Sequence, residues 1–248
     1  METTNTISLK PYSRPLLTHV AKHLPATVKV FSQQRGCCKM TSKVQIGILD
    51  YGIGNLRSVQ KAFEVQGIEA HLHQEAAALQ RCDKLILPGV GAFGDCMQSL
   101  ENSGLRPLVE GWIADGRPLL GICVGFQMLL ECSHEFGLHK GLGIVCGEVK
   151  PFRGSVCSQL KIPQMGWNTV RFLQPSILTE GLGEEEYFYF VHSFYCDVQS
   201  PGTVLGVTDY SLSYCTAMQK GCLYGTQFHP EKSSSAGLKI LKNFALKG

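Results

Sequence analysis

Short apolar segments that alternate with helix-like stretches are the feature of residues 44–140 that most restricts the fold. Residues 44–49, 84–87 and 118–123 have the length and the turn-rich borders of buried strands. A shorter strand is expected at 70–73, and helices at 55–66, 94–102, 105–115 and 125–132. Parallel strands need long crossover connections and are covered on both faces. This order therefore predicts an α/β fold with a parallel sheet between helices.

From about residue 140 the pattern changes to strand-like segments separated by turn residues. They cover residues 145–152, 170–173, 187–195, 204–208, 215–219 and 223–227, and a helix is expected at 236–246. Neither an internal repeat nor a linker interrupts this part of the sequence. We therefore predict one domain over residues 44–248, with a mixed, mostly parallel sheet flanked by helices.

Residues 1–43 differ in composition from the rest of the chain. They hold seven Lys and Arg residues and one acid, Glu2, whereas residues 44–248 hold sixteen basic and nineteen acidic residues. We expect a disordered or non-native N-terminal extension over residues 1–43. Residues 1–39 are a tail, sequence upstream of a true start at Met40, or an organelle transit peptide, which is typically basic and poor in acids. The expected location is the cytoplasm, or a plastid or another organelle in the last case.

Composition excludes several classes of protein. A content of 44% hydrophobic and 17% charged residues is typical of globular chains, and no apolar run reaches the roughly 20 residues of a membrane-spanning helix. The net charge of +3 belongs to the N-terminal extension, so it does not favour nucleic acid binding. The eleven cysteines form no C-x-x-C pair and no Cys/His module with zinc-site spacing. We expect mostly reduced, buried thiols and no metal.

One cysteine stands in a pattern that indicates a nucleophile. Gly121-Ile-Cys123-Val-Gly125 joins the end of a predicted strand to the start of a predicted helix, as in a nucleophile elbow with Cys in place of Ser. Small neighbours are needed because the backbone turns sharply there. The positive end of the helix lowers the pKa of a thiol, and backbone N–H groups at the turn can stabilise an oxyanion. A merely buried cysteine is the alternative, and the strand–turn–helix context favours the nucleophile.

A base for this thiol is predicted at His229, in the segment Gln227-Phe-His-Pro-Glu231. Pro230 favours extended backbone before it, and residues two apart in an extended segment share a side. Glu231 can therefore orient the His229 imidazole, as the third group of a triad. The other histidines lack such context, and His192 could be a packed core histidine.

A glycine-rich segment, Gly89-Val90-Gly91-Ala-Phe-Gly94, formally matches the dinucleotide-binding pattern G-x-G-x-x-G. We discount that reading because Pro88 interrupts the strand-to-turn geometry and Asp115 does not follow a strand. Glycine-rich turns after parallel strands expose backbone N–H groups at the edge where α/β sites lie. Residues 89–91 are therefore expected to form an oxyanion loop beside Cys123.

Together these motifs are similar to those of a known family. The motifs are Asp50-Tyr-Gly-Ile-Gly-Asn-Leu-Arg-Ser58, Pro88-Gly-Val-Gly-Ala-Phe93, Gly121-Ile-Cys-Val-Gly-Phe-Gln-Met-Leu130, Pro163-Gln-Met-Gly-Trp-Asn168, Val191-His-Ser193 and Gln227-Phe-His-Pro-Glu-Lys-Ser233. From about Val44 to Phe244 the chain resembles class I (triad) glutamine amidotransferases, whose fold is flavodoxin-like. Within that family it is similar to the glutaminase subunits of imidazole glycerol phosphate synthase, which act in histidine biosynthesis.

The resemblance implies a role for each matched residue. Cys123 would attack the glutamine amide, His229 would transfer protons, and Glu231 would hold His229. The oxyanion would be bound by the loop Gly89-Val90-Gly91 with the N–H of Val124, and this loop can reorient when a partner binds. The residues matched to the glutamine-binding positions are Gln127, Glu135, Ser193 and Phe194. Relatives often carry Tyr where this chain has Phe194, and we expect this change to be tolerated.

The resemblance also implies a partner. In this family ammonia passes to a separate (β/α)₈ cyclase, which makes imidazole glycerol phosphate and an aminoimidazole carboxamide ribotide. A cyclase barrel needs roughly 250 residues, so this chain has no room for one. The matched interface positions are Trp167, Asn168, Tyr189 and Lys232. A core role for Trp167 and a solvated one for Lys232 are the alternatives. We expect no cofactor, no nucleic acid and no membrane partner.

Three other functions compete with this interpretation. A triad glutaminase for anthranilate or vitamin B6 synthesis is disfavoured by the segments Asp50–Asn55 and Met165–Asn168. A catalytically silent regulatory module is disfavoured by the complete set of Cys123, His229 and Glu231. An α/β-hydrolase esterase is disfavoured because that fold places its acid before the histidine in the chain.

Overall fold

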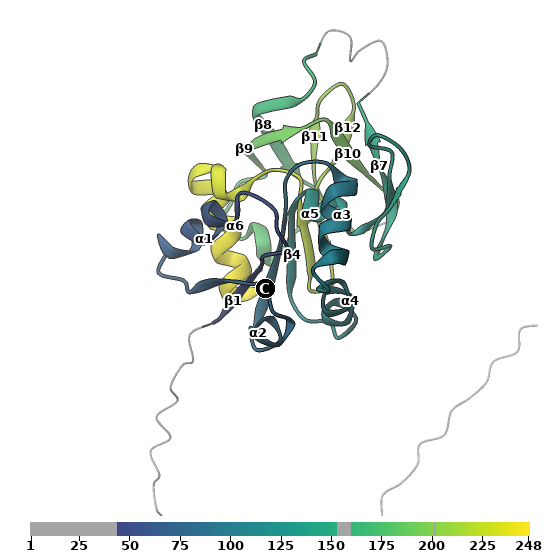
Figure 1. Ribbon diagram of the computed structural model, residues 1–248. Helices are drawn as coiled ribbons and strands as arrows, with labels where there is room; N and C mark the ends of the chain where they lie inside the picture. Colours follow the sequence, from purple (N-terminus) through teal and green to yellow (C-terminus); the bar gives the residue numbers. More distant parts are fainter. Residues whose placement is uncertain (1–43, 153–159, 201) are drawn as a thin grey trace, which may run out of the picture. The chain divides into compact units, whose positions relative to one another are not determined.

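The computed structural model describes residues 44–152, 160–200 and 202–248 (Figure 1). The predicted extension over residues 1–43 lies outside the described residues. The parallel half of the sheet consists, in spatial order, of β2 (Ala70–His73), β1 (Ile46–Leu49), β3 (Lys84–Gly89), β4 (Leu119–Cys123) and β13 (Leu223–Thr226). Every residue of β1, β3, β4 and β13 is buried. Such continuous burial is what strands covered on both faces require.

The sheet continues beyond β13 with mostly antiparallel pairs. The strands that follow are, in order, β12 (Ser213–Lys220), β10 (Phe194–Val198), β7 (Val145–Pro151), β5 (Leu130–Ser133) and β6 (His139–Lys140). A side branch leaves β12 through β11 (Val204–Asp209), β8 (Gln164–Phe172) and β9 (Glu185–His192). Burial alternates along β9, as expected for strands with one open face.

Helices cover the parallel half on both sides (Figure 1). The helices are α1 (Leu56–Glu64), α2 (Ala76–Gln80), α3 (Phe93–Asn102), α4 (Arg106–Ala114), α5 (Val124–Gln127) and α6 (Ser234–Lys247), with 3-10 turns η2 (Ile177–Thr179) and η3 (Pro230–Lys232). Helices α1 and α6 contact one another on one side, and α3 and α4 lie on the other. The predicted α/β fold with a mixed sheet flanked by helices is confirmed. No helix among the described residues is long and apolar enough to cross a bilayer.

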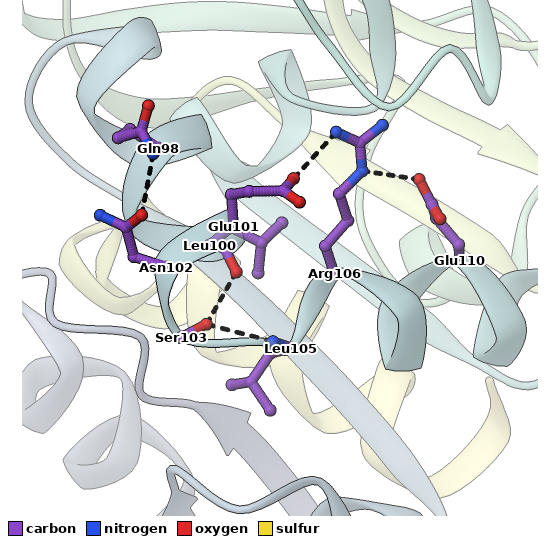
Figure 2. A network of polar contacts seen from close by, with 8 residues as sticks. All are labelled: Gln98, Leu100, Glu101, Asn102, Ser103, Leu105, Arg106 and Glu110. Atoms are coloured by element: carbon purple, nitrogen blue, oxygen red, sulfur yellow. Dashed lines mark hydrogen bonds and ion pairs between the residues drawn. The ribbon is translucent and has the colours of Figure 1, made fainter.

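Polar contacts fix the turn between α3 and α4 (Figure 2). The Ser103 hydroxyl donates to the Leu100 carbonyl at 2.8 Å and accepts from the Leu105 N–H at 3.3 Å. Arg106 then pairs with Glu101 at 3.0 Å and with Glu110 at 2.8 Å. These half-exposed ion pairs each contribute little energy. The serine bonds close the turn that joins α3, the helix after the predicted oxyanion loop, to α4.

Three of the predicted elements are wrong in their boundaries. The strand expected at 170–173 is only the end of β8, which begins at Gln164. The helix expected at 125–132 ends after Gln127, because residues 130–133 instead pair with β7 and β6 as strand β5. The strand expected at 187–195 is two strands broken at Ser193. Strand β9 pairs with β8, whereas β10 pairs with β12 and β7. The apolar pattern runs across both breaks, so periodicity alone could not locate them.

Candidate active site

Cys123 occupies the turn between β4 and α5. Its φ of 56° and ψ of −114° are rare for a residue with a side chain. A Cβ on Gly125 would overlap the Leu87 carbonyl oxygen, and one on Gly121 would lie 2.8 Å from the Gly125 carbonyl oxygen. The two glycines therefore let β3, β4 and α5 pack backbone against backbone. This turn is the sharp elbow that the G-x-C-x-G pattern predicts, at the carboxyl end of the parallel strands.

His229 and Glu231 lie together at η3, just beyond β13. The His229 Nδ1 and a Glu231 carboxylate oxygen are 2.8 Å apart, and both side chains are buried. The same carboxylate oxygen accepts a 2.7 Å hydrogen bond from the Asn55 amide. The predicted pairing of His229 with Glu231 is therefore present, but the extended backbone predicted through Glu231 is wrong, because Pro230–Lys232 form the 3-10 turn η3. Asn55, at the end of the loop after β1, is a further partner that was not predicted from the sequence.

The backbone of His229 is held as firmly as its ring. Its N–H donates to the Tyr189 carbonyl at 3.0 Å. Its carbonyl accepts from the Ser233 hydroxyl at 2.6 Å, and that hydroxyl in turn accepts from the Tyr189 N–H at 2.9 Å. Strand β9 thus fixes the position from which the imidazole extends.

The electrostatics of this pair favour a charged imidazole. Burial opposes the charge on His229, but its interactions with the Cys123 sulfur and the Glu231 carboxylate outweigh burial and raise its pKa above the ordinary value. Burial alone would raise the pKa of Glu231, whereas the bonds from His229 and Asn55 lower it. The ring nitrogen Nε2 of His229 has no hydrogen-bond partner within the described part of the chain. This nitrogen can therefore exchange a proton with a ligand near Cys123.

A cavity of about 200 Å³ opens on this group of side chains. Its walls are Val90, Gly91, Cys123, Val124, Gln127, Glu135, Val191, His192, Ser193, Phe194 and His229. Every residue predicted for catalysis, the oxyanion or the substrate is in this wall except Gly89 and Glu231, which lie behind it. Val191 and His192 are additional. A volume below the usual range for drug-sized ligands suits one small metabolite.

Two buried glutamines support the floor of the cavity. Gln127 donates to the Gln227 side chain at 3.0 Å and to the Phe194 carbonyl at 3.2 Å. The Gln227 amide in turn donates to the Cys123 sulfur across 3.8 Å. This chain of bonds ties β13, α5 and β10 together beneath the thiol. Gln227 was not predicted as a site residue, although it lies two residues before His229.

Glu135 forms an acidic part of the wall. It is half-buried, and its carboxylate accepts the Phe93 N–H at 2.7 Å, at the start of α3. Burial raises its pKa while that hydrogen bond lowers it, with a net upward shift. The group is thus placed to meet a cationic part of a ligand, which would favour its charged form.

His192 lines the same cavity but is fully engaged elsewhere. Its Nδ1 lies 2.7 Å from the Phe194 carbonyl and its Nε2 lies 3.1 Å from the Tyr214 hydroxyl. That hydroxyl also lies 2.7 Å from the Gln164 side chain. Burial lowers the pKa of His192 to about 4, and the neighbouring His229 adds to the effect. The possible packed-core role of His192 agrees with this environment.

The glycine-rich loop lies beside the elbow, since Gly89 pairs with Cys123 across β3 and β4. Tyr51 donates to the Pro88 carbonyl at 2.5 Å, and the Cys96 thiol donates to the Val90 carbonyl at 3.3 Å. One reason for discounting a dinucleotide site was wrong, because β3 continues through Pro88 to Gly89. The register with β1 runs to Ile86 and the register with β4 runs to Gly89, so Pro88 lies in the part of β3 that pairs with β4.

The residues matched to an interface gather on β8, β9 and η3. Trp167 pairs with Tyr189 across the two strands, with ring centroids 6.2 Å apart, and the Lys232 ammonium lies 6.0 Å from the Tyr189 ring centre. Trp167 is 53% exposed, so it is not a core residue. Asn168 is half-buried and donates to the Asp209 carbonyl at 3.1 Å.

Comparison with solved structures supports the same fold. The chain aligns with a glutamine amidotransferase at a TM-score of 0.63 and 20% identity, over 80% of this chain and 96% of the other. It also aligns with PurLQS from Thermotoga maritima at a TM-score of 0.62 and 16% identity, over 82% and 97% of the two chains. At these identities the likeness concerns the fold alone.

Sequence relatives are much closer. Two proteins named "Imidazole glycerol phosphate synthase subunit HisH" are 47% and 45% identical to this chain, from Chlorobaculum tepidum and Geobacter metallireducens. The alignments cover 80% and 81% of this chain, and 98% and 97% of the relatives. Residues 48–247 match the family described as "Glutamine amidotransferase class-I". The cysteine elbow, the buried histidine–glutamate pair and this match over most of the sequence show that the chain belongs to the class-I glutamine amidotransferase family.

Proposed function

We propose that this chain is the glutaminase subunit of an imidazole glycerol phosphate synthase, and that it hydrolyses glutamine to glutamate and ammonia. The observation that carries the proposal is the placement of Cys123 on a strained elbow, where its sulfur interacts with the His229 imidazole. The same imidazole is paired with Glu231 at 2.8 Å. The subunit name of the relatives at 45–47% identity, which align over nearly their whole length, supports the choice of complex.

The reaction is an acyl transfer in two steps. The Cys123 sulfur attacks the side-chain amide carbon of glutamine, and the carbon–nitrogen bond breaks as His229 gives its proton to the leaving ammonia. A γ-glutamyl thioester remains on Cys123. Water then attacks the thioester carbon while His229 accepts a proton, which releases glutamate and restores the starting side chains. Glu231 and Asn55 keep the ring oriented and stabilise its charged form.

The remaining wall of the cavity binds the substrate. The Glu135 carboxylate pairs with the glutamine ammonium, and Gln127 with the backbone at Ser193 and Phe194 holds the rest of the molecule. The loop Gly89-Val90-Gly91 and the N–H of Val124 stabilise the oxyanion. Neither glutamine hydrolysis nor the donor set of this cavity calls for a cofactor.

The ammonia passes to a separate cyclase subunit with a (β/α)₈ barrel, and the two chains form a heterodimer. Trp167, Asn168, Tyr189 and Lys232 meet that subunit, because Trp167 and Lys232 are exposed and the Tyr189 carbonyl on β9 holds His229. The cytoplasm is the proposed location, unless residues 1–39 act as a transit peptide. The catalytic domain is placed over residues 44–248.

The test is glutamine hydrolysis by the purified chain, alone and with the cyclase subunit and its nucleotide ligand. We expect low activity alone and strong stimulation in the mixture. Cys123→Ala should lower the stimulated rate by about a thousandfold or more. Cys146→Ala, which removes an exposed cysteine on β7, is the matched control and should have no effect. An active Cys123→Ala chain would contradict the mechanism, and a chain indifferent to the cyclase would contradict the choice of complex.

A further inference from the structure

A second cluster of reactive side chains lies outside the cavity, on neighbouring strands β5 and β7. Cys132 pairs directly with Glu148 in the register of these parallel strands. His134 follows two residues after Cys132, and residues two apart along an extended chain point to the same side. The pairing of the strands thus gathers a thiol, an imidazole and a carboxylate from positions 132, 134 and 148.

The donor atoms of these three side chains are close enough to share one ion. The Cys132 sulfur, a His134 ring nitrogen and a Glu148 carboxylate oxygen all lie within 4.8 Å of one another. The His134 Nε2 and a Glu148 oxygen are 3.1 Å apart. Two ligands of a tetrahedral zinc ion are separated by about 3.3 to 3.6 Å, given bond lengths of about 2.0 to 2.3 Å. Small side-chain rotations would therefore bring all three donors into a coordination sphere.

We propose that Cys132, His134 and Glu148 bind a zinc ion, with water as the fourth ligand. The combination of one sulfur, one nitrogen and one oxygen donor suits zinc, whereas magnesium and calcium prefer oxygen ligands alone. The sequence alone does not indicate this site, because the three residues match no paired Cys/His module and Glu148 joins the cluster only through the pairing of β5 with β7.

The surroundings allow an ion to enter and be neutralised. His134 is exposed, whereas Cys132 and Glu148 are half-buried, and an open hollow borders His134 and Glu148. One cation competes for the carboxylate, since the Lys150 ammonium lies 3.6 Å from Glu148. The same ammonium is 2.6 Å from Asp197, so it keeps a closer partner when Glu148 turns to the metal.

The test measures metal binding directly and does not depend on glutaminase activity. The full chain without an affinity tag carries Cys123→Ala, so that the thiol and imidazole of the cavity cannot bind metal together. After removal of metal with a chelator, Zn²⁺ is titrated against a chromophoric chelator. Co²⁺ is added in a parallel titration to detect sulfur ligation by absorbance. We expect one equivalent of Zn²⁺ and a thiolate–Co²⁺ charge-transfer band.

Single variants identify the ligands. Cys132→Ala, His134→Gln and Glu148→Gln should each weaken Zn²⁺ binding about tenfold or more, and Cys132→Ala should abolish the charge-transfer band. Cys146→Ala on β7 and His139→Gln on β6 are the matched controls, and circular dichroism checks that every variant is folded. The proposal is overturned if the chain takes up no Zn²⁺ against the chelator. It is also overturned if the controls weaken binding as much as the ligand variants do.

Discussion

Two buried histidines in one cavity wall are held in opposite protonation states. Burial opposes the charge on His229, but the Cys123 sulfur and the Glu231 carboxylate, 2.8 Å from its Nδ1, outweigh burial and stabilise the charged form. His192 is equally buried, but its ring nitrogens meet a carbonyl and a tyrosine hydroxyl instead of a carboxylate. Burial then dominates and keeps its ring neutral at physiological pH. The chemistry of each histidine is thus set by its partner and not by its depth.

The neutral state of His192 has a measurable consequence for stability. Its pKa falls from 6.5 to about 4 on folding, so the unfolded chain binds more protons between these values. The free energy of unfolding should therefore fall by about 2 kcal/mol, because of this residue, as the pH falls from 7 to 5. Urea unfolding at pH 5, 6 and 7 measures this loss. Protonation of Glu231 also destabilises the fold at low pH, so the comparison is with His192→Gln. Between pH 7 and pH 5 this variant should lose about 2 kcal/mol less unfolding free energy than the wild type. Equal losses of unfolding free energy in the two chains would contradict the prediction.

Those site residues whose roles depend on local geometry could be predicted from the sequence. Cys123 needs small neighbours at two fixed positions, and His229 and Glu231 are only two residues apart in the chain, although the 3-10 turn η3 replaces the extended segment that was predicted. Asn55 was missed as a partner of Glu231 because the two lie 176 residues apart, and their contact depends on how α1 and η3 pack. One signal was available: Asn55 ends the loop at the carboxyl end of β1, the sheet edge where α/β sites gather.

At the scale of elements, the elbow depends on an unusually close approach of β3, β4 and α5. The backbone of Gly125 meets the Leu87 carbonyl, and that of Gly89 meets Val124 and Gly125, with no room for a Cβ at either glycine. The strained conformation of Cys123 is maintained by this packing, because the turn cannot relax without moving two buried strands. Helix α5 is only four residues long, so it gains little stability of its own.

Gly125→Ala should therefore prevent folding or destabilise the chain by about 4 kcal/mol or more, because its Cβ would overlap backbone that cannot move. Gly111→Ala is the matched control. Gly111 lies in the exposed face of α4, where an added Cβ would meet no atom of the described residues within 4 Å. This change should stabilise the chain by about 0.5 to 1 kcal/mol. Thermal unfolding followed by circular dichroism compares the two. A Gly125→Ala chain that melts at the wild-type temperature would show that the elbow tolerates a side chain.

The elements themselves were predictable to different degrees. The buried parallel strands are continuous apolar runs in the sequence. In the amphipathic helix α1, the apolar residues recur at the spacing of one helix face. Strands β5 and β6 were missed because their residues are partly exposed and their pairing comes from distant β7 and from one another. The break at Ser193 was missed for a related reason, since β9 and β10 separate only because they pair with different neighbours.

Across the molecule, the exposed aromatic face and the buried catalytic pair share one strand. Met165, Trp167, Tyr187 and Tyr189 lie on the same side of the β8–β9 pair, and the first three are among the most exposed apolar side chains of the described residues. The Tyr189 carbonyl holds the His229 N–H, and its N–H holds Ser233. A subunit that docks on this face would press on the strand that positions His229. This arrangement gives a partner a short physical route to the catalytic group.

Trp167→Ala should therefore weaken docking of the partner without destabilising the fold. Large aromatic anchors often dominate an interface, so we expect binding to the cyclase subunit to weaken by about 2 kcal/mol or more, roughly thirtyfold. The stimulated glutaminase rate at limiting cyclase should fall with it, while the melting temperature of the free chain stays unchanged because Trp167 is 53% exposed. Leu173→Ala is the matched control, since Leu173 is 49% exposed just beyond the far end of β8. Calorimetric titration with the cyclase measures both variants, and equal losses for the two would place the docking surface elsewhere.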